Sequence, residues 1–190
     1  KLLTFIPSIK EMPVSDFNWT GFNLVRVKDK VNDINFTEAL LEKAKEVRLN
    51  LQNELDKSPY NVVLQLGWGS NWSILKTAAQ LFYFIDAYPD LFDPEILYSS
   101  VNFVLGAHPA SNHSFVSGVG SKSATLVYGF NRADKSYQPG GVISGVTLIK
   151  PDFVEYRGRA WDWYQTEHVI SGSSAYIFDI LATDYLLNRK

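Results

Sequence analysis

Apolar and polar positions alternate most regularly between residues 36 and 57. Apolar side chains recur there at intervals of three and four residues, and Glu, Lys and Arg lie between them. The apolar set is Phe36, Ala39, Leu40, Ala44, Val47, Leu51 and Leu55. This spacing predicts an amphipathic helix with one face in water. Asn35 is the predicted N-cap with Glu38 as its capping-box partner, and Ser58-Pro59 ends the helix.

Two more helices are predicted after this one. Residues 72–87 are apolar on nearly every side, which is typical of an inner helix that neighbouring elements cover. Ser70 or Asn71 would cap its first turn. Asp93-Pro94 then begins a third helix, and Gly106 stands where a C-terminal helix glycine is expected.

The remaining segments are less regular. Prolines interrupt residues 1–35, and residues 16–23 are interpreted as a loop or a short extended segment. Residues 107–165 are rich in glycine and proline, so they predict a long loop region, which is usually functional inside a compact domain. A last helix is predicted at about 167–187, with Thr166 as its N-cap and Glu167 in its first turn.

An amphipathic helix followed by an apolar one indicates two layers of helices. We therefore predict an all-α fold with long loops, in which residues 1–190 form a single domain. No internal repeat and no low-complexity segment occurs in the chain.

Composition excludes several classes of protein. The net charge is −2 and no basic stripe occurs, so nucleic acid is not an expected partner. The chain has no cysteine, which excludes disulfides and thiolate metal sites. It has no apolar run of 18 residues, so no membrane span is expected. It begins at Lys1 and its only methionine is Met12, which we interpret as the sign of a processed or truncated piece.

The segment with the most suggestive chemistry runs from residue 161 to residue 170. Trp161, Trp163 and Tyr164 lie close in sequence to Glu167. Sugar rings present flat C–H faces that stack on aromatic rings, and a glycosidic oxygen needs a carboxylic acid that donates a proton. The alternative is an ordinary helix N-terminus in which the aromatic residues belong to the core. Trp68, between Gly67 and Gly69, is a further stacking candidate with the same alternative.

Other kinds of catalytic site have little support. His108 and His113 lack a third ligand at suitable spacing, so no metal is predicted, and no cofactor is expected. No Gly-x-Ser-x-Gly motif occurs, so a serine hydrolase site is not predicted.

Three segments, taken in order, resemble the C-terminal part of the catalytic domain of glycoside hydrolase family 9, the cellulase-like inverting enzymes. Residues 66–71 read Leu-Gly-Trp-Gly-Ser-Asn, and residues 101–109 and 114–120 are similar to the family's Leu-Gly-x-Asn-Pro and Val-x-Gly-x-Gly runs. Thr166-Glu167 stands where the family has Asn-Glu. The resemblance implies part of an (α/α)6 barrel, the six-hairpin glycosidase fold, with Glu167 as the general acid.

The same resemblance suggests which residues contact the substrate. The expected binding residues are Arg132, Asn131, Tyr128, Trp68, Trp161, Trp163 and Tyr164. Where the family has a His-His-Arg segment, this chain reads Tyr-Gly-Phe-Asn-Arg at residues 128–132. The chain therefore resembles a divergent branch that acts on an oligosaccharide or a plant or microbial polysaccharide.

The catalytic base has no clear counterpart in this sequence. Asp152 and Asp162 are the only nearby acids, and we interpret them as loop or hydrogen-bonding residues. Nothing in residues 1–60 resembles the family's Asp-x-x-Asp segment, which activates the water. The resemblance therefore implies that the base belongs to a missing N-terminal part of the same protein, and that this chain alone is inactive. It also implies an exported protein. A third of a closed barrel would expose apolar helix faces, so we expect either self-association or helix packing that differs from a full barrel.

Two other functions stay open from the sequence. The first is a non-catalytic glycan-binding or structural helical domain, in which Glu167 is only part of a helix cap. The second is a polysaccharide lyase that uses Tyr128 and Arg132.

Overall fold

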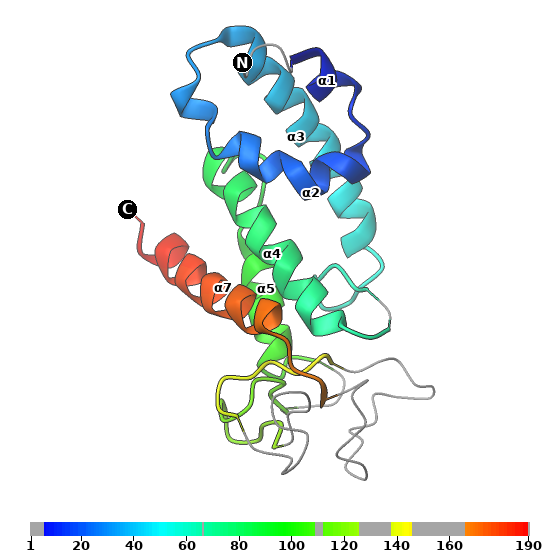
Figure 1. Ribbon diagram of the computed structural model, residues 1–190, viewed down its shortest axis with the longest axis vertical. Coiled ribbons are helices and arrows are strands. Elements are labelled where there is room, and N and C mark those ends of the chain that lie inside the picture. Colours follow the sequence, from blue (N-terminus) through cyan, green and yellow to red (C-terminus); the bar gives the residue numbers. More distant parts are fainter. Residues whose placement is uncertain (1–5, 66, 109–111, 126–137, 146–165, 190) are drawn as a thin grey trace.

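The computed structural model describes residues 6–65, 67–108, 112–125, 138–145 and 166–189. The described residues form helices and loops without a named strand. The helices are α1 (Ile6–Glu11), α2 (Val14–Val25), α3 (Ile34–Leu55), α4 (Ser70–Ala87), α5 (Glu95–Val104) and α7 (Ile170–Asn188), with a 3-10 turn, η2, at Lys28–Lys30. Figure 1 shows them stacked along the long axis of the molecule, with the loops of residues 112–125 and 138–145 at one end.

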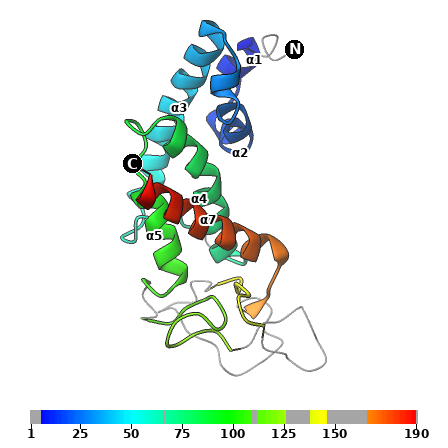
Figure 2. The same ribbon diagram turned by 90° about the vertical axis from the view of Figure 1, so that its left-hand side faces the viewer.

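Helix α4 lies at the centre of this arrangement. It packs against α7, α5 and α2, and α2 also packs against α3. Helices α4 and α7 run side by side in the same direction, as Figures 1 and 2 show. At their first turns Gly172 lies against Trp72. At their last turns the Tyr185 hydroxyl donates a hydrogen bond to Asp86 over 3.3 Å.

The core consists of two apolar clusters. The upper cluster joins α1, α2 and α3 to the second half of α4, and its largest fully buried side chains are Phe17, Phe36, Phe84 and Phe92. The lower cluster joins the first half of α4 and the second half of α5 to the loops that follow. Phe115 and Val142 bring those loops into the lower cluster. The lower cluster therefore supports the loop end of the molecule.

The early chain differs from the prediction. Residues 16–23 lie within α2 and are not a loop, because Phe17, Gly21 and Val25 recur every four residues and bury one face of that helix. Helix α3 begins earlier than predicted. Its N-cap is Asp33, whose side chain accepts a hydrogen bond from the backbone N–H of Phe36 over 2.9 Å, so the prediction of Asn35 is wrong.

The next two helices agree with the prediction. Helix α4 spans Ser70–Ala87, with nine buried residues that include Trp72, Leu75 and Phe84. Its N-cap is Gly69, so Ser70 and Asn71 lie inside the first turn and are not caps. Helix α5 follows Asp93, whose carboxylate accepts from the Glu95 N–H over 2.9 Å. Gly106 follows its C-cap with a φ of 126°, as predicted for a terminal glycine.

The last helix begins three residues later than predicted. Its N-cap is Val169 and its first residue is Ile170, so neither Thr166 nor Glu167 belongs to its first turn. Residues 167 and 168 instead lie in extended backbone that pairs with the loop at residues 143 and 144. None of the helices in the described ranges is long and apolar enough to span a bilayer.

Candidate active site

The site is built around the turn that leads into α4. Gly67 and Gly69 have φ angles of 106° and 79°, a region that favours glycine, and they place Trp68 between them. The Trp68 side chain is 45% exposed, although it is large and apolar. The two glycines add no side chains that would cover the indole.

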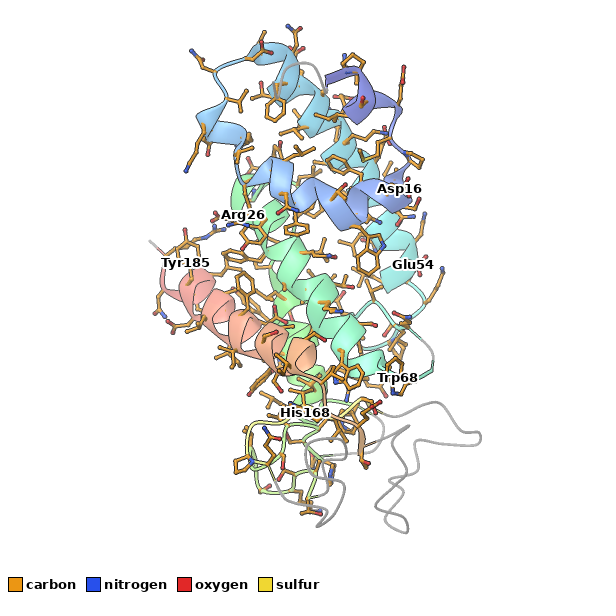
Figure 3. All side chains as sticks on the ribbon, viewed as in Figure 1. Asp16, Arg26, Glu54, Trp68, His168 and Tyr185 are labelled. Atoms are coloured by element: carbon orange, nitrogen blue, oxygen red, sulfur yellow. The ribbon has the colours of Figure 1, made fainter. Side chains whose placement is uncertain are left out.

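Glu167 reaches this turn from the far end of the chain. Its carboxylate oxygen Oε2 accepts a hydrogen bond from Trp68 Nε1 over 2.7 Å. Its backbone carbonyl accepts from the Ser144 N–H over 2.8 Å, and His168 forms a β-bridge with Ile143. Glu167 is therefore held through both its main chain and its side chain, and Figure 3 shows Trp68 and His168 at the same end of the helical stack.

Asn71 fixes the loop that holds Glu167. Its side chain is fully buried, and its Nδ2 donates to the carbonyl of Ile143 over 3.2 Å. Its backbone N–H donates to the carbonyl of Ser144 over 3.1 Å. Gly145 follows at a φ of 103°, and a Cβ there would overlap the Asn71 amide. The first turn of α4 therefore positions residues 143–145, and these residues position Glu167.

Trp72 supports Trp68 from the protein interior. The two indole rings meet edge to face, with centroids 5.2 Å apart and planes at 84°. Trp72 is 5% exposed, and its Nε1 donates to the carbonyl of Val142 over 3.0 Å. Because both indole N–H groups are bonded, the two rings are held in fixed orientations.

His168 links the loop to α7. Its Nε2 lies 2.9 Å from Ser173 Oγ, which donates to the carbonyl of Gly140 and accepts from the Val142 N–H. The direction of the bond between His168 and Ser173 depends on the tautomer of the imidazole. Burial lowers the pKa of His168, which favours the neutral imidazole.

The other histidine of interest belongs to the lower cluster. His108 is 5% exposed and stacks on Phe115, with ring centroids 4.1 Å apart. Its Nε2 donates to the carbonyl of His113 over 2.8 Å, and burial lowers its pKa. Within the described part of the chain, no three His, Cys, Asp or Glu side chains are grouped as metal ligands.

The structure brings together two of the predicted site residues, Glu167 and Trp68. The other predicted residues lie outside the described residues, and they are Tyr128, Asn131, Arg132, Trp161, Trp163 and Tyr164. The sequence did not predict the positioning roles of Asn71, Trp72, Gly145 and Ser173. The adjacency of Asn71 and Trp72 to the Gly-Trp-Gly turn was a usable signal, whereas nothing in the sequence pointed to Ser173.

Comparisons with known proteins place this geometry within a fold. No protein-family model and no curated protein matches the chain. A solved structure of a Bacteroides ovatus GH9 protein matches over 82% of this chain, with a TM-score of 0.67 and 18% identity. The cellulase Cel9M of C. cellulolyticium, solved in complex with cellobiose, matches over 86%, with a TM-score of 0.49 and 20% identity.

These matches bear on the prediction of the fold. The all-α architecture agrees with part of the (α/α)6 barrel of the Bacteroides GH9 structure, so this prediction is confirmed. The chain spans about 30% of the length of that structure and 38% of Cel9M.

Proposed function

We propose that this chain is the C-terminal portion of the catalytic domain of an inverting glycoside hydrolase, and that Glu167 is its general acid. The observation that carries the proposal is the 2.7 Å hydrogen bond from Trp68 Nε1 to Glu167 Oε2. It joins a carboxyl group to a half-exposed aromatic ring across 99 positions of sequence. The fold shared with the Bacteroides GH9 structure supports the same assignment.

The chemistry follows from this pair. Because Trp68 Nε1 donates to Oε2, that oxygen is an acceptor, which leaves Oε1 as the oxygen that carries the proton to the glycosidic oxygen. A second carboxylate on the opposite face of the sugar would activate water, with the two groups about 6.5–9.5 Å apart. The part of the protein that completes the barrel would supply this base. The 190-residue chain alone is therefore expected to be inactive.

The exposed indole of Trp68 gives the substrate an apolar surface. A pyranose ring that stacks on it would lie within reach of the Glu167 carboxyl group, because the two side chains are in direct contact. The substrate class is an oligosaccharide or polysaccharide, and such substrates lie outside the cytoplasm, so we also propose that the protein is exported.

The test is Glu167→Gln in the protein that carries the complete barrel. Turnover of an unactivated β-glucan should fall by roughly 10³-fold or more, because no acid remains to protonate the leaving oxygen. Aryl glycosides with good leaving groups need less protonation and should lose much less. Glu38→Gln is the matched control, since Glu38 is exposed on α3.

Two results would overturn the assignment. Unchanged turnover of the β-glucan by the Glu167→Gln variant would exclude Glu167 as the acid. Equal losses on both substrate types would indicate that the substitution damages the structure, without a specific loss of proton transfer.

A further inference from the structure

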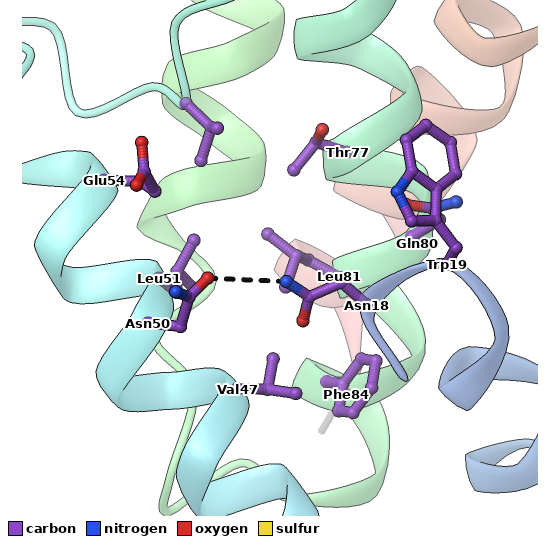
Figure 4. Close-up of a pocket in the computed structure, with 11 residues that line it drawn as sticks. Asn18, Trp19, Val47, Asn50, Leu51, Glu54, Thr77, Gln80, Leu81 and Phe84 are labelled. Carbon is purple, nitrogen blue, oxygen red and sulfur yellow. Dashed lines mark hydrogen bonds between the residues drawn. The ribbon is translucent and has the colours of Figure 1, made fainter. Parts of the chain in front are cut away.

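A hollow between α2, α3 and α4 lies apart from the Glu167 site. Its volume is about 160 Å³, and its floor is apolar, with Val47, Leu51, Leu81 and Phe84 among its residues. The α4 residues that line it begin at Thr77, about two helical turns beyond Ser70. Figure 4 shows this hollow with Trp19 and Gln80 at one side and Glu54 at the other.

Polar side chains from three helices surround the apolar floor. Asn18 Nδ2 on α2 donates to Asn50 Oδ1 on α3 over 3.4 Å, which is a long hydrogen bond. Asn18 Oδ1 is buried and has no hydrogen-bond donor among the described residues. Gln80 and Glu54 also line the hollow, and Lys57 pairs with Glu54 over 2.7 Å. The hollow therefore offers amide donors and acceptors, and its carboxylate, Glu54, is paired with Lys57.

Trp19 stands at the rim with 67% of its surface exposed. It also lines a second hollow of about 250 Å³, formed with Phe22, Ala79 and Tyr83. Gln80 lines both hollows as well. One indole and one amide are therefore shared by two adjoining depressions.

We propose that these two hollows form a binding site for two neighbouring units of a neutral oligosaccharide. Each unit of such a chain has an apolar C–H face and a ring of hydroxyl groups. The C–H faces match Trp19 and the apolar floor, and the hydroxyls match the side chains of Asn50, Gln80 and Glu54. One carboxylate, Glu54, lines the first hollow and one cation, Lys76, lines the second, so the two hollows together carry no excess charge that would favour a phosphorylated or carboxylated ligand.

This site does not depend on the hydrolase proposal. It uses no residue of the Glu167 site, and it would hold a glycan at the flank of the helical stack. The binding experiment measures affinity and needs no turnover. Failure of this binding site and failure of the Glu167 assignment therefore give different results.

The test is isothermal titration of the chain with cellotetraose, laminaritetraose, xylotetraose and free glucose. At least one tetrasaccharide should bind saturably. Trp19→Ala should weaken that binding about tenfold, the equivalent of one stacking contact. Gln80→Ala should weaken it about threefold, as expected for one lost hydrogen bond. Asn53→Ala, an exposed position of α3 outside both hollows, should leave that affinity within twofold of the wild type.

Folding and location are checked separately. Trp19 is mostly exposed, so its substitution should leave the thermal midpoint almost unchanged. In two-dimensional NMR spectra, the side-chain amides of Asn50 and Gln80 should shift on titration. The proposal is overturned if no tetrasaccharide binds at about 10 mM, if Trp19→Ala binds like the wild type, or if glucose binds as tightly as the best tetrasaccharide.

Discussion

Gly172 lies directly against the indole ring of Trp72, and a Cβ at position 172 would overlap that ring. The contact sets the spacing of α7 and α4 at their first turns. It also bears on the candidate site, because Trp72 meets Trp68 edge to face and Trp68 bonds to Glu167. Gly172 on α7 thus determines the position of the Trp72 indole on α4. Through Trp68, it also affects the position of the Glu167 carboxylate.

Gly172→Ala should therefore destabilise the chain although alanine favours helices. The added methyl group has to displace Trp72, and overpacking of this kind costs about 1–3 kcal/mol. Thermal unfolding and near-UV circular dichroism, which reports on the indole environments, would measure the effect. Ser171→Ala, one residue earlier and exposed, is the matched control and should be neutral or slightly stabilising. Equal stability of the two variants would show that the contact is easily relieved.

Trp68→Phe separates the hydrogen bond to Glu167 from the aromatic surface. Phenylalanine keeps a ring for sugar stacking but loses the N–H that donates to Oε2. In the protein with the complete barrel, we expect kcat on an unactivated polysaccharide to fall about 10- to 100-fold, because the carboxyl group loses its orientation. The Michaelis constant should change much less. Trp19→Phe, on α2, is the control and should leave kcat unchanged. An unaltered kcat for Trp68→Phe would remove the positioning role.

Asp179 should make the chain less stable as the pH rises. It is fully buried in α7, its carboxyl oxygens have no hydrogen-bond partner among the described residues, and burial raises its pKa from 3.8 to about 9. The folded state therefore holds a proton that the unfolded state releases above pH 4. Stability is fully present below pH 4 and is lost progressively as the pH rises toward 9.

Asp179→Asn is the test of this effect. The variant keeps the shape of the side chain and cannot ionise, so its stability should change less between pH 5 and 8. At pH 8 it should exceed the wild type by on the order of 2 kcal/mol. Denaturant unfolding at several pH values would measure this. Asp184→Asn, on an exposed position of the same helix, is the control. Parallel pH profiles for the wild type and Asp179→Asn would contradict the prediction.

The regular helices of this fold were predictable because their apolar residues recur with a clear period. Helix α2 was not predicted, because it contains Asn, Thr and Gly, which have low helix propensity. It also has few charged residues that would indicate a solvent-exposed face. Burial of Phe17 stabilises it despite this composition. The spacing of Phe17, Gly21 and Val25 was the one signal available.

The candidate site was predictable only in part. The Gly-Trp-Gly turn and Glu167 could be identified from residue types and from resemblance, and the hydrogen bond between them supports that pairing. The late start of α7 could not be predicted. It arises from the backbone bonds between residues 143–144 and residues 167–168, a long-range pairing with no local sequence pattern.

His168 should make the chain less stable in mild acid. Burial lowers its pKa in the folded state, so the unfolded state binds the proton more readily. The contribution is present above the usual histidine pKa of about 6.5 and is lost as the pH falls below it. Between pH 7 and 5 we expect His168→Gln to lose less stability than the wild type, because glutamine takes up no proton in this range. His108→Gln should behave similarly, since its pKa is also lowered by burial. Over this range Asp179 has the opposite effect, so each variant is compared with the wild type, and a pH profile parallel to that of the wild type would contradict the expectation for that histidine.

The outer face of α7 predicts how the 190-residue chain behaves in solution. Large exposed apolar side chains lie on this face, opposite the stripe that packs on α4. Ile170, Ile177 and Leu181 form this apolar row, with exposed fractions of 82%, 60% and 64%. Exposed apolar side chains grouped in this way favour association, so we expect the chain to self-associate at micromolar concentrations. Sedimentation velocity of the wild type, of Ile177→Glu with Leu181→Glu, and of Asn53→Glu on α3 would test it. The double variant should be monomeric and the control should associate like the wild type, because only the former places charges within the apolar row. A wild type that stays monodisperse and monomeric would show that this face has no affinity for itself.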